Sequence, residues 1–176
     1  MSEKLTVRIA TSNDAYTISE LAKQTFTESF GQNYSPTALE NYLNQTFNFN
    51  KIAASIDKLN NFFLLAIFNQ LPVGYLKLKL DLRFKNLNYA KQSQLQKIYV
   101  LNDYIGNQIG TSLLNRGIQY LKERKVEVLW LDVLQTNNKA IKFYERHGFE
   151  KFDIYIHRFE EFDSTFDVMI KKLQNK

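Results

Sequence analysis

Apolar residues recur along the chain with two different periods, and the period changes from segment to segment. Between residues 15 and 30, Ile18, Leu21, Ala22 and Phe26 share one side of a helix, because steps of three and four residues return to the same face. Short runs rich in β-branched and aromatic residues, such as NFFLLAIF, are typical of strands. The pattern predicts strands at 5–10, 61–68, 72–82, 94–101, 126–133, 151–159 and 165–173, and helices at 15–30, 36–47, 51–59, 111–125 and within 137–149.

Local signals mark where several of these elements begin. The helix-capping residues TSND precede the first helix, and Ser35 followed by Pro36 is typical of a helix start. The segment NQLP, residues 69–72, joins two strands as a hairpin. The order strand, helix, strand from 94 to 133 predicts a βαβ unit with parallel, adjacent strands. We therefore expect a mixed α/β fold, and the absence of any linker-like stretch predicts one domain over residues 1–176.

The amino-acid composition excludes several kinds of chemistry. The chain has no cysteine, which excludes a disulfide framework, a thiolate nucleophile and a zinc site built on cysteine. The two isolated histidines, His147 and His157, make a poor metal set, so we expect no metal. The first thirty residues read neither as a signal peptide nor as a membrane span, which predicts a cytoplasmic protein without a membrane partner. A net charge of +5 suits a nucleotide diphosphate as well as a nucleic acid.

One junction between a strand and a helix has the features of an anion site. The segment IYVLNDYIGNQIGTSLL, residues 98–114, runs from a strand through a loop with Gly106 and Gly110 into a helix start. Backbone N–H groups and the helix dipole at such a start attract a phosphate. The loop matches neither Walker A nor GxGxxG, which makes ATP and NAD poor ligands. Two glycines also suit a tight turn that binds nothing, and this alternative stays open.

Two segments are considered together, QKIYVLNDYIGNQIGTSLLNRGIQYL and VLWLDVLQTNNKAIKFYERHGFEKF. Both resemble the core motifs of the GCN5-related N-acetyltransferases (GNAT). The second contains the family pattern N-x-x-A-x-x-F-Y-x-x-x-G-F at every defined position, namely Asn137, Ala140, Phe143, Tyr144, Gly148 and Phe149. The resemblance implies acetyl-CoA as co-substrate. It also implies a central, mostly antiparallel twisted sheet with a parallel splayed pair of strands and flanking helices.

The resemblance implies cofactor-binding roles for three groups of residues. The strand end Ile98, Tyr99 and Val100 would hold the pantetheine arm and the thioester carbonyl, and Asn137 would cap its helix and bind the pantetheine amide. The pyrophosphate would lie against Ile105, Gly106, Asn107, Gln108, Ile109, Gly110 and Thr111. The family pattern for this loop is Gln/Arg-x-x-Gly-x-Gly/Ala, from which Ile105 and Gln108 depart. We expect these departures to weaken phosphate binding without abolishing it.

Acyl transfer from a thioester to an amine needs positioning, a hydrogen-bond donor to the oxyanion and a proton for the departing thiolate. Tyr144 is the predicted general acid beside the sulfur, because a phenol with a pKa of about 10 protonates a thiolate whose thiol has a pKa of about 8.5. The alternative is a core tyrosine that shares a helical face with Ala140 and Ile141.

The general base is not fixed by the sequence. Many relatives in this family carry a Glu where this chain has Gln96, which cannot act as a base. Asp132 and Glu28 are the carboxylates predicted to face the acceptor, directly or through water, although solvated surface charge explains each of them equally well. His147 precedes Gly148, and we expect it to complement the end of its helix.

The N-terminal half is informative about the acceptor. Residues 21–43 and 62–80 are similar to bacterial polyamine N-acetyltransferases of the PaiA type, which implies spermidine or spermine as the amine. N-terminal amines of proteins or peptides, amino sugars and a non-catalytic acyl-CoA-binding module stay open as alternatives. A nucleic-acid partner is not favoured, because Lys and Arg are scattered and form no basic stripe. The sequence leaves open whether the protein forms a homodimer.

Overall fold

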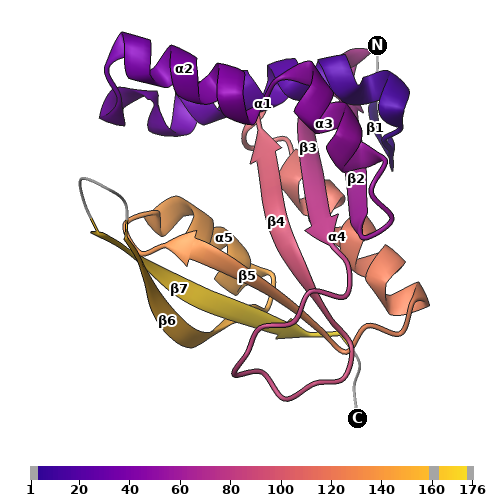
Figure 1. The fold of residues 1–176 in the computed structure, drawn as a ribbon. Coiled ribbons are helices and arrows are strands. Elements are labelled where there is room, and N and C mark those ends of the chain that lie inside the picture. The colour runs from indigo at the N-terminus through magenta and orange to yellow at the C-terminus, as the bar shows by residue number, and fades with distance from the viewer. Residues whose placement is uncertain (1–3, 159–162, 174–176) are drawn as a thin grey trace. The chain divides into compact units, whose positions relative to one another are not determined.

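The computed structural model describes residues 4–158 and 163–173 and divides into two compact units (Figure 1). The first unit comprises Met1–Lys79 and Lys97–Gly117, and the second comprises Leu80–Gln96 and Ile118–Lys176. One strand, β4, passes from the second unit into the first. The single domain that the sequence predicts over residues 1–176 remains a prediction.

The elements follow the order that the sequence predicts. The strands are β1 (Leu5–Ile9), β2 (Asn61–Phe68), β3 (Leu71–Lys79), β4 (Gln92–Val100), β5 (Val128–Leu134), β6 (Glu150–Arg158) and β7 (Asp163–Lys172). The α-helices are α1 (Ala15–Phe30), α2 (Pro36–Thr46), α3 (Phe49–Ile56), α4 (Ile109–Glu123) and α5 (Asn138–Arg146), and the short 3-10 helices are η1 (Ser12–Asp14), η2 (Gly31–Asn33) and η3 (Asn102–Tyr104). Phe159, the last residue of one predicted strand, lies outside the described residues.

The described strands form a seven-stranded sheet in the order β1-β2-β3-β4-β5-β7-β6. The predicted parallel pair is confirmed, since β4 and β5 run parallel from Gln92 opposite Val128 to Gln94 opposite Trp130. The pairs β1–β2, β2–β3, β5–β7 and β6–β7 are antiparallel. A mixed α+β fold with a mostly antiparallel sheet is therefore confirmed.

Two boundaries differ from the prediction for physical reasons. The hairpin turn is shorter than residues 69–72, because Asn69 and Gln70 adopt φ angles of 48° and 70° and Leu71 already pairs with Phe68. Such left-handed angles at both central residues match the twist of a two-residue hairpin. Helix α4 begins at Ile109, before the predicted Thr111, and its first intrahelical bond runs from Ser112 N to Gln108 O.

The first unit buries apolar side chains on both faces of β2 and β3. One face carries Phe63, Leu65 and Tyr75, which pack with Ile18 of α1 and Ile52 of α3. The alternate residues of β3, Leu76 and Leu78, point the other way and contact Gly117 of α4. This alternation follows from the period of two in a strand, and it places α1 and α3 on one face and α4 on the opposite face (Figure 1).

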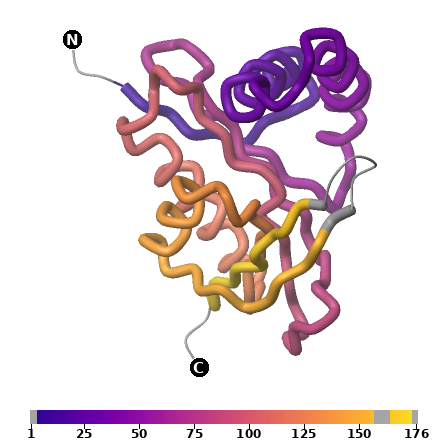
Figure 2. The backbone as a smooth tube through the Cα atoms, turned by 90° about the vertical axis from the view of Figure 1, so that its left-hand side faces the viewer, coloured from indigo at the N-terminus to yellow at the C-terminus, as the bar shows by residue number. Residues whose placement is uncertain are grey.

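The second unit is built on the β5–β7–β6 part of the sheet. Figure 2 shows β6 and β7, the orange and yellow strands, side by side as an antiparallel pair. One face carries Val128, Trp130 and Val168, which are covered by the segment between β3 and β4 through Phe84 and Leu87. On the opposite face, Lys171 Nζ donates to the backbone oxygen of His147 at the end of α5, at 2.6 Å. The segment and α5 therefore cover opposite faces.

Candidate functional site

The predicted anion loop of the first unit has the backbone that such a site requires. Gly106 adopts φ +100°, in the left-handed region that glycine enters without strain, and an added Cβ there would meet no atom within 4 Å. Gln108 adopts φ 57° just before α4. The N–H groups of Ile109 and Gly110 precede the first intrahelical bond of α4, at the positive end of a 15-residue helix. The loop therefore presents donors and a dipole to an anion.

The family pattern has glycine where this chain has Gln108, and the φ angle of Gln108 explains that preference. A residue with a side chain reaches this angle only with some strain, whereas glycine reaches it freely. Ile105 is exposed, with 64% of its surface accessible, while Ile109 is buried at 1%. Ile109 thus anchors the loop in the core, and Ile105 is available to a ligand.

Glu28 lies on α1, and its carboxylate is bonded to the turn that leads into this loop. Its Oε2 accepts the backbone N–H of Asn102 at 2.9 Å, and its Oε1 accepts from Gln24 Nε2 at 3.0 Å. Asn102 begins η3, whose first N–H groups lack partners within the turn. The structure therefore gives Glu28 a capping role in the first unit.

A close approach of β3 and β4 supports the end of β4. A Cβ built on Gly74 of β3 would lie 2.7 Å from the backbone oxygen of Tyr99, so only glycine fits there. Leu101 N donates to Val73 O at 2.9 Å, and the rings of Tyr75 and Tyr99 stack with centroids 5.9 Å apart. Gly74 thereby fixes the segment from Ile98 to Val100 that is predicted to hold the thioester.

In the second unit, α5 begins and ends as the motif predicts. The side chain of Asn137 caps the helix by accepting the N–H of Ala140 at 3.2 Å, which confirms the predicted N-cap. His147 is the C-cap and bonds Phe143 O through Nδ1 at 2.7 Å, and Gly148 follows in the left-handed region at φ +77°. Both features confirm the predicted end of the helix.

Tyr144 is half-buried on α5. Its ring contacts the rings of Phe143 and Phe149 edge-on, with centroids 5.5 and 5.6 Å away. Phe149 is buried, so the two phenylalanines hold the tyrosine ring against the end of the helix. This packing fixes the ring's orientation, which a positioned acid requires and a core tyrosine also shows.

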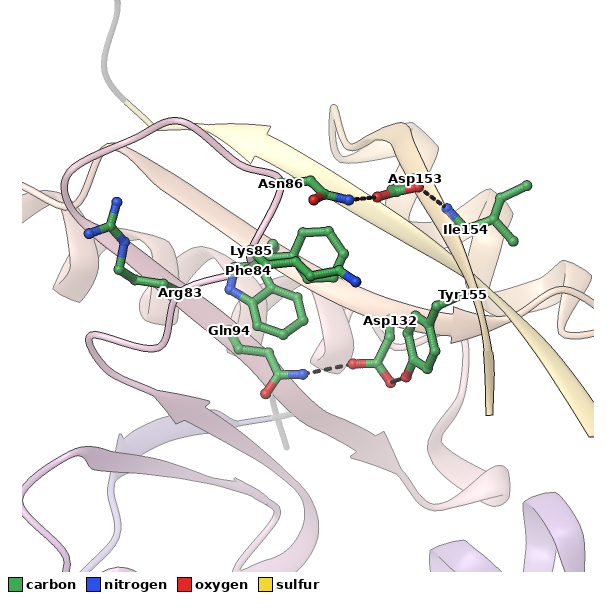
Figure 3. A pocket seen from close by; sticks show the side chains of 10 residues that line it. Arg83, Phe84, Lys85, Asn86, Gln94, Asp132, Asp153, Ile154 and Tyr155 are labelled. Atoms are coloured by element: carbon green, nitrogen blue, oxygen red, sulfur yellow. Dashed lines mark hydrogen bonds between the residues drawn. The ribbon is translucent and has the colours of Figure 1, made fainter. Parts of the chain in front are cut away.

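Asp132 lies in a cavity of about 490 Å³ in the second unit (Figure 3). Gln94 Nε2 donates to its Oδ1 at 2.7 Å, and the Tyr155 hydroxyl donates to its Oδ2 at 3.1 Å. Aromatic walls come from Phe84, Trp130 and Tyr155. A carboxylate that lines a cavity together with aromatic residues is suited to a cation.

Three charged groups complete the lining of this cavity. Asp153 accepts from Asn86 Nδ2 at 2.8 Å and from the backbone N–H of Ile154 at 2.8 Å. These two hydrogen bonds, and the nearby charge of Lys85, lower the pKa of Asp153, so this carboxylate is ionised at neutral pH. Arg83 also lines the cavity and donates to Tyr89 O at 3.4 Å. The lining therefore balances two negative charges with two positive ones.

The predicted site residues fall into two sets. Glu28, the end of β4 and the loop from Ile105 to Thr111 belong to the first unit. Asp132, Asn137 and Tyr144 belong to the second.

The sequence did not single out Gly74, Gln94 or Tyr155. Side chains two residues apart in a strand point to the same face, so Gln94 shares a face of β4 with Gln96. This shared face was a weak indication that Gln94 belongs to the site. The bond from Tyr155 to Asp132 spans β7, and its register is not readable from the sequence.

Between residues 4 and 158 and between 163 and 173, no group of three or more His, Cys, Asp or Glu side chains could hold a metal ion. Within the same residues, no helix has the length and apolar character that crossing a membrane demands.

Comparisons with known proteins agree on one family. Residues 16–149 match the model of the acetyltransferase (GNAT) family. The chain is 22% identical over 173 residues to the spermidine N(1)-acetyltransferase of Thermoplasma acidophilum, which covers 96% of this chain and 98% of that one. It is 34% identical over 82 residues to the ribosomal protein bS18-alanine N-acetyltransferase of Escherichia coli, covering 47% and 55% of the two chains.

A solved structure has the same fold. The crystal structure of the PaiA N-acetyltransferase from Thermoplasma acidophilum, in complex with coenzyme A, superposes with a TM-score of 0.74 at 22% identity. The match covers 96% of this chain and 99% of that chain. The predicted central sheet with flanking helices is therefore shared with a protein of known structure.

Proposed function

The chain belongs to the GNAT acetyltransferase family, and from that premise we propose that it transfers the acetyl group of acetyl-CoA directly to a primary amine of a polyamine such as spermidine or spermine. The protein is an acyltransferase, and acetyl-CoA is its co-substrate.

On the donor side, the loop and helix start of the first unit would bind acetyl-CoA. The N–H groups of Ile109 and Gly110 and the positive end of α4 favour the pyrophosphate. Backbone of Ile98 to Val100 would hold the thioester, supported by the close approach at Gly74. Asn137, whose side-chain oxygen caps α5, would bind the pantetheine amide through its remaining groups.

The reaction needs a nucleophile, a proton donor for the sulfur and a proton acceptor for the nitrogen. The neutral amine nitrogen attacks the thioester carbonyl carbon and forms a tetrahedral oxyanion in which the nitrogen is cationic. The C–S bond then breaks, and the nitrogen gives up its proton to a carboxylate or a water, which leaves a neutral amide. We assign the proton that reaches the departing sulfur to the Tyr144 hydroxyl, whose ring is held by Phe143 and Phe149. Tyr155 is a poor alternative, because burial and the neighbouring Asp132 carboxylate raise the pKa of its phenol above the usual range.

The single observation that supports a polyamine as the acceptor is the position of Asp132 in a cavity lined by aromatic residues. A polyamine has an apolar chain between ammonium groups, so it matches a carboxylate surrounded by aromatic walls. The similarity to a spermidine N(1)-acetyltransferase over nearly the whole chain supports the same acceptor. Asp132 could act on the amine by binding an ammonium or by accepting its proton.

A second acceptor class is favoured by a different observation. Arg83 and Lys85 line the same cavity and would pair with an acceptor that carries a carboxylate, such as a protein or peptide with a free N-terminus. The local similarity to a ribosomal protein bS18-alanine N-acetyltransferase points to this class as well.

An assay of CoA release decides between these acceptors. Purified protein is given acetyl-CoA with spermidine, with a peptide bearing a free N-terminus, or with an amino sugar, and product mass is checked in each case. We expect the highest kcat/KM with spermidine. Turnover of the peptide alone would overturn the polyamine proposal, and acetyl-CoA binding without turnover of any amine would indicate a non-catalytic acyl-CoA-binding module.

A further inference from the structure

The two hydrogen bonds to Asp132 come from different strands on either side of its own strand. Gln94 lies on β4, opposite Trp130 in the parallel pair, and reaches forward along β5. Tyr155 lies on β6 opposite Phe166, and Phe166 lies opposite Leu134 of β5, so the phenol reaches back across β7. Each oxygen of Asp132 thus receives one donor, and the two donors fix the plane of the carboxylate.

Tyr155 is itself held in place. Its ring stacks on the ring of Phe166 with centroids 5.3 Å apart and an angle of 10° between the planes. Burial comes first among the causes that raise its pKa, followed by the charge of Asp132 and the hydrogen bond to it. The phenol therefore keeps its proton at neutral pH and serves as a fixed donor.

The carboxylate keeps acceptor capacity after both bonds are made. An ionised carboxylate has about four acceptor positions, and the two donors are neutral groups. Asp132 takes no part in the ion pairs Arg8–Asp14, Lys23–Glu20 and Lys151–Asp167. Its negative charge is therefore available to a cation that enters the cavity (Figure 3).

We propose that Gln94 and Tyr155 are positioning residues that hold Asp132 as the carboxylate that binds an ammonium group of the acceptor. The proposal rests on the amine acetyltransferase function and adds two residues that determine acceptor selectivity. The ammonium would donate to a remaining lone pair of Asp132, and the aromatic residues that line the cavity, Phe84 and Trp130, would surround it. Neither positioning residue takes part in proton transfer.

The test separates acceptor binding from chemistry. Tyr155→Phe keeps the stacking ring and removes the donor, Gln94→Met keeps the volume of the side chain, and Tyr16→Phe is the matched control because Tyr16 is 67% exposed. Each variant is assayed with spermidine and with a monoamine of the same chain length. We expect each positioning variant to raise KM for spermidine about tenfold, as the loss of a hydrogen bond to a charged group implies.

Three readouts distinguish positioning from a general structural role. The KM for acetyl-CoA, the kcat and the kcat/KM with the monoamine should stay within about twofold of wild type, since these do not depend on Asp132 binding a second charge. Wild-type kinetics for spermidine in both Tyr155→Phe and Gln94→Met would overturn the proposal. Equal losses with both amines would also overturn it. If one variant fails to fold by circular dichroism, the other still provides the test.

Calorimetry measures spermidine binding without turnover, so it tests the ammonium site separately from the identity of the substrate. Spermidine is titrated into wild type, Asp132→Asn and Tyr155→Phe in the absence of acetyl-CoA. Binding by wild type that weakens about tenfold in both variants supports the ammonium site even if another amine proves to be the substrate. Absence of binding by wild type overturns the ammonium site, while turnover of a peptide by the same protein would overturn only the polyamine.

Discussion

Glu28 on α1 accepts the backbone N–H of Asn102 at 2.9 Å, which joins the first long helix to the turn after β4. The turn leads directly into the loop with Gly106 that precedes α4. A carboxylate bound to a backbone N–H caps that turn, and Gln24 occupies the other oxygen. The geometry therefore favours a role in positioning the loop over a role as a base.

Glu28→Gln and Glu28→Ala should have different effects. Glutamine retains an oxygen that accepts the Asn102 N–H, so we expect kcat to change less than about threefold. Alanine leaves the N–H of Asn102 without its carboxylate partner, and the acetyl-CoA affinity should fall about fivefold as the turn loosens. Steady-state kinetics and calorimetry measure both quantities. A kcat that drops by roughly 10²-fold in Glu28→Gln would instead identify Glu28 as the catalytic base.

The anion loop gives a second prediction. Gly110 lies in the first turn of α4, where backbone must come close to a pyrophosphate, and Gly110→Val places a branched side chain there. We expect calorimetry to show acetyl-CoA affinity reduced by about tenfold or more while circular dichroism shows an intact fold. Asn115→Val, at an exposed position of the same helix, is the control for helix propensity. Equal affinity in the two variants would place the cofactor elsewhere.

Tyr144 gives the third prediction. Tyr144→Phe preserves the ring contacts with Phe143 and Phe149 and removes the hydroxyl proton. We expect kcat to fall roughly 10²-fold while the affinity for acetyl-CoA stays near wild type. Tyr16→Phe again serves as the control for the substitution itself. An unchanged kcat would make Tyr144 a packing residue and would leave the mechanism without its acid.

The sequence predicted the elements well because their signals are local. Ser35 followed by Pro36 predicted the start of α2. Asn137 predicted the start of α5 through its capping side chain, and Gly148, which is in the left-handed region, predicted its end. The site was predicted less completely, since Asp132 is joined to Gln94 and Tyr155 by strand pairing across 38 and 23 residues of sequence. A strand register of this kind is set by packing of the whole sheet.

Lys77 gives a prediction about stability. Burial, followed by the charges of Lys79, Lys97 and Lys58, lowers the pKa of Lys77 to about 8, while its ammonium lies 5.3 Å from the centre of the Phe63 ring. In the unfolded chain a lysine has a pKa of about 10.4. The unfolded state therefore binds more protons between pH 8 and pH 10, so stability from this group rises with pH across that window.

Lys77→Met should consequently stabilise the protein at pH 7, because it keeps the apolar stem and removes the buried charge. We expect the free energy of unfolding to rise by about 1–2 kcal/mol, allowing for solvent around a half-buried group. The gain should shrink as pH rises from about 8 to about 10, where wild-type Lys77 becomes neutral. Urea unfolding at pH 7 and pH 10 measures the difference, with Lys122→Met at an exposed position as control. A gain that is the same at both pH values would exclude the charge as its cause.

Asp132 and Asp153 occupy one row of the sheet, because both lie opposite Val168, from β5 and from β6. Residues paired in this way point to the same face, and two strand spacings separate their Cα atoms by about 10 Å. The two carboxylates could therefore bind two ammonium groups of one chain. Lys85 opposes this arrangement, since its charge already acts on Asp153 in the same cavity.

Lys85→Gln should therefore improve the enzyme for a polyamine. Removal of this positive charge leaves Asp153 to the substrate, so we expect KM for spermidine to fall about twofold to threefold, as the small energy of an exposed ion pair implies. Asp153→Asn should raise KM by a similar factor. The double variant should return close to wild type, because the opposite charges of the two residues offset each other in wild type and are both absent in the double variant. Both effects should fade in roughly 0.5 M salt, where screening shortens the range of exposed charges. A monoamine of equal length is the control substrate. If Lys85→Gln lowered KM for the monoamine as much as for spermidine, the second carboxylate would have no part in acceptor binding.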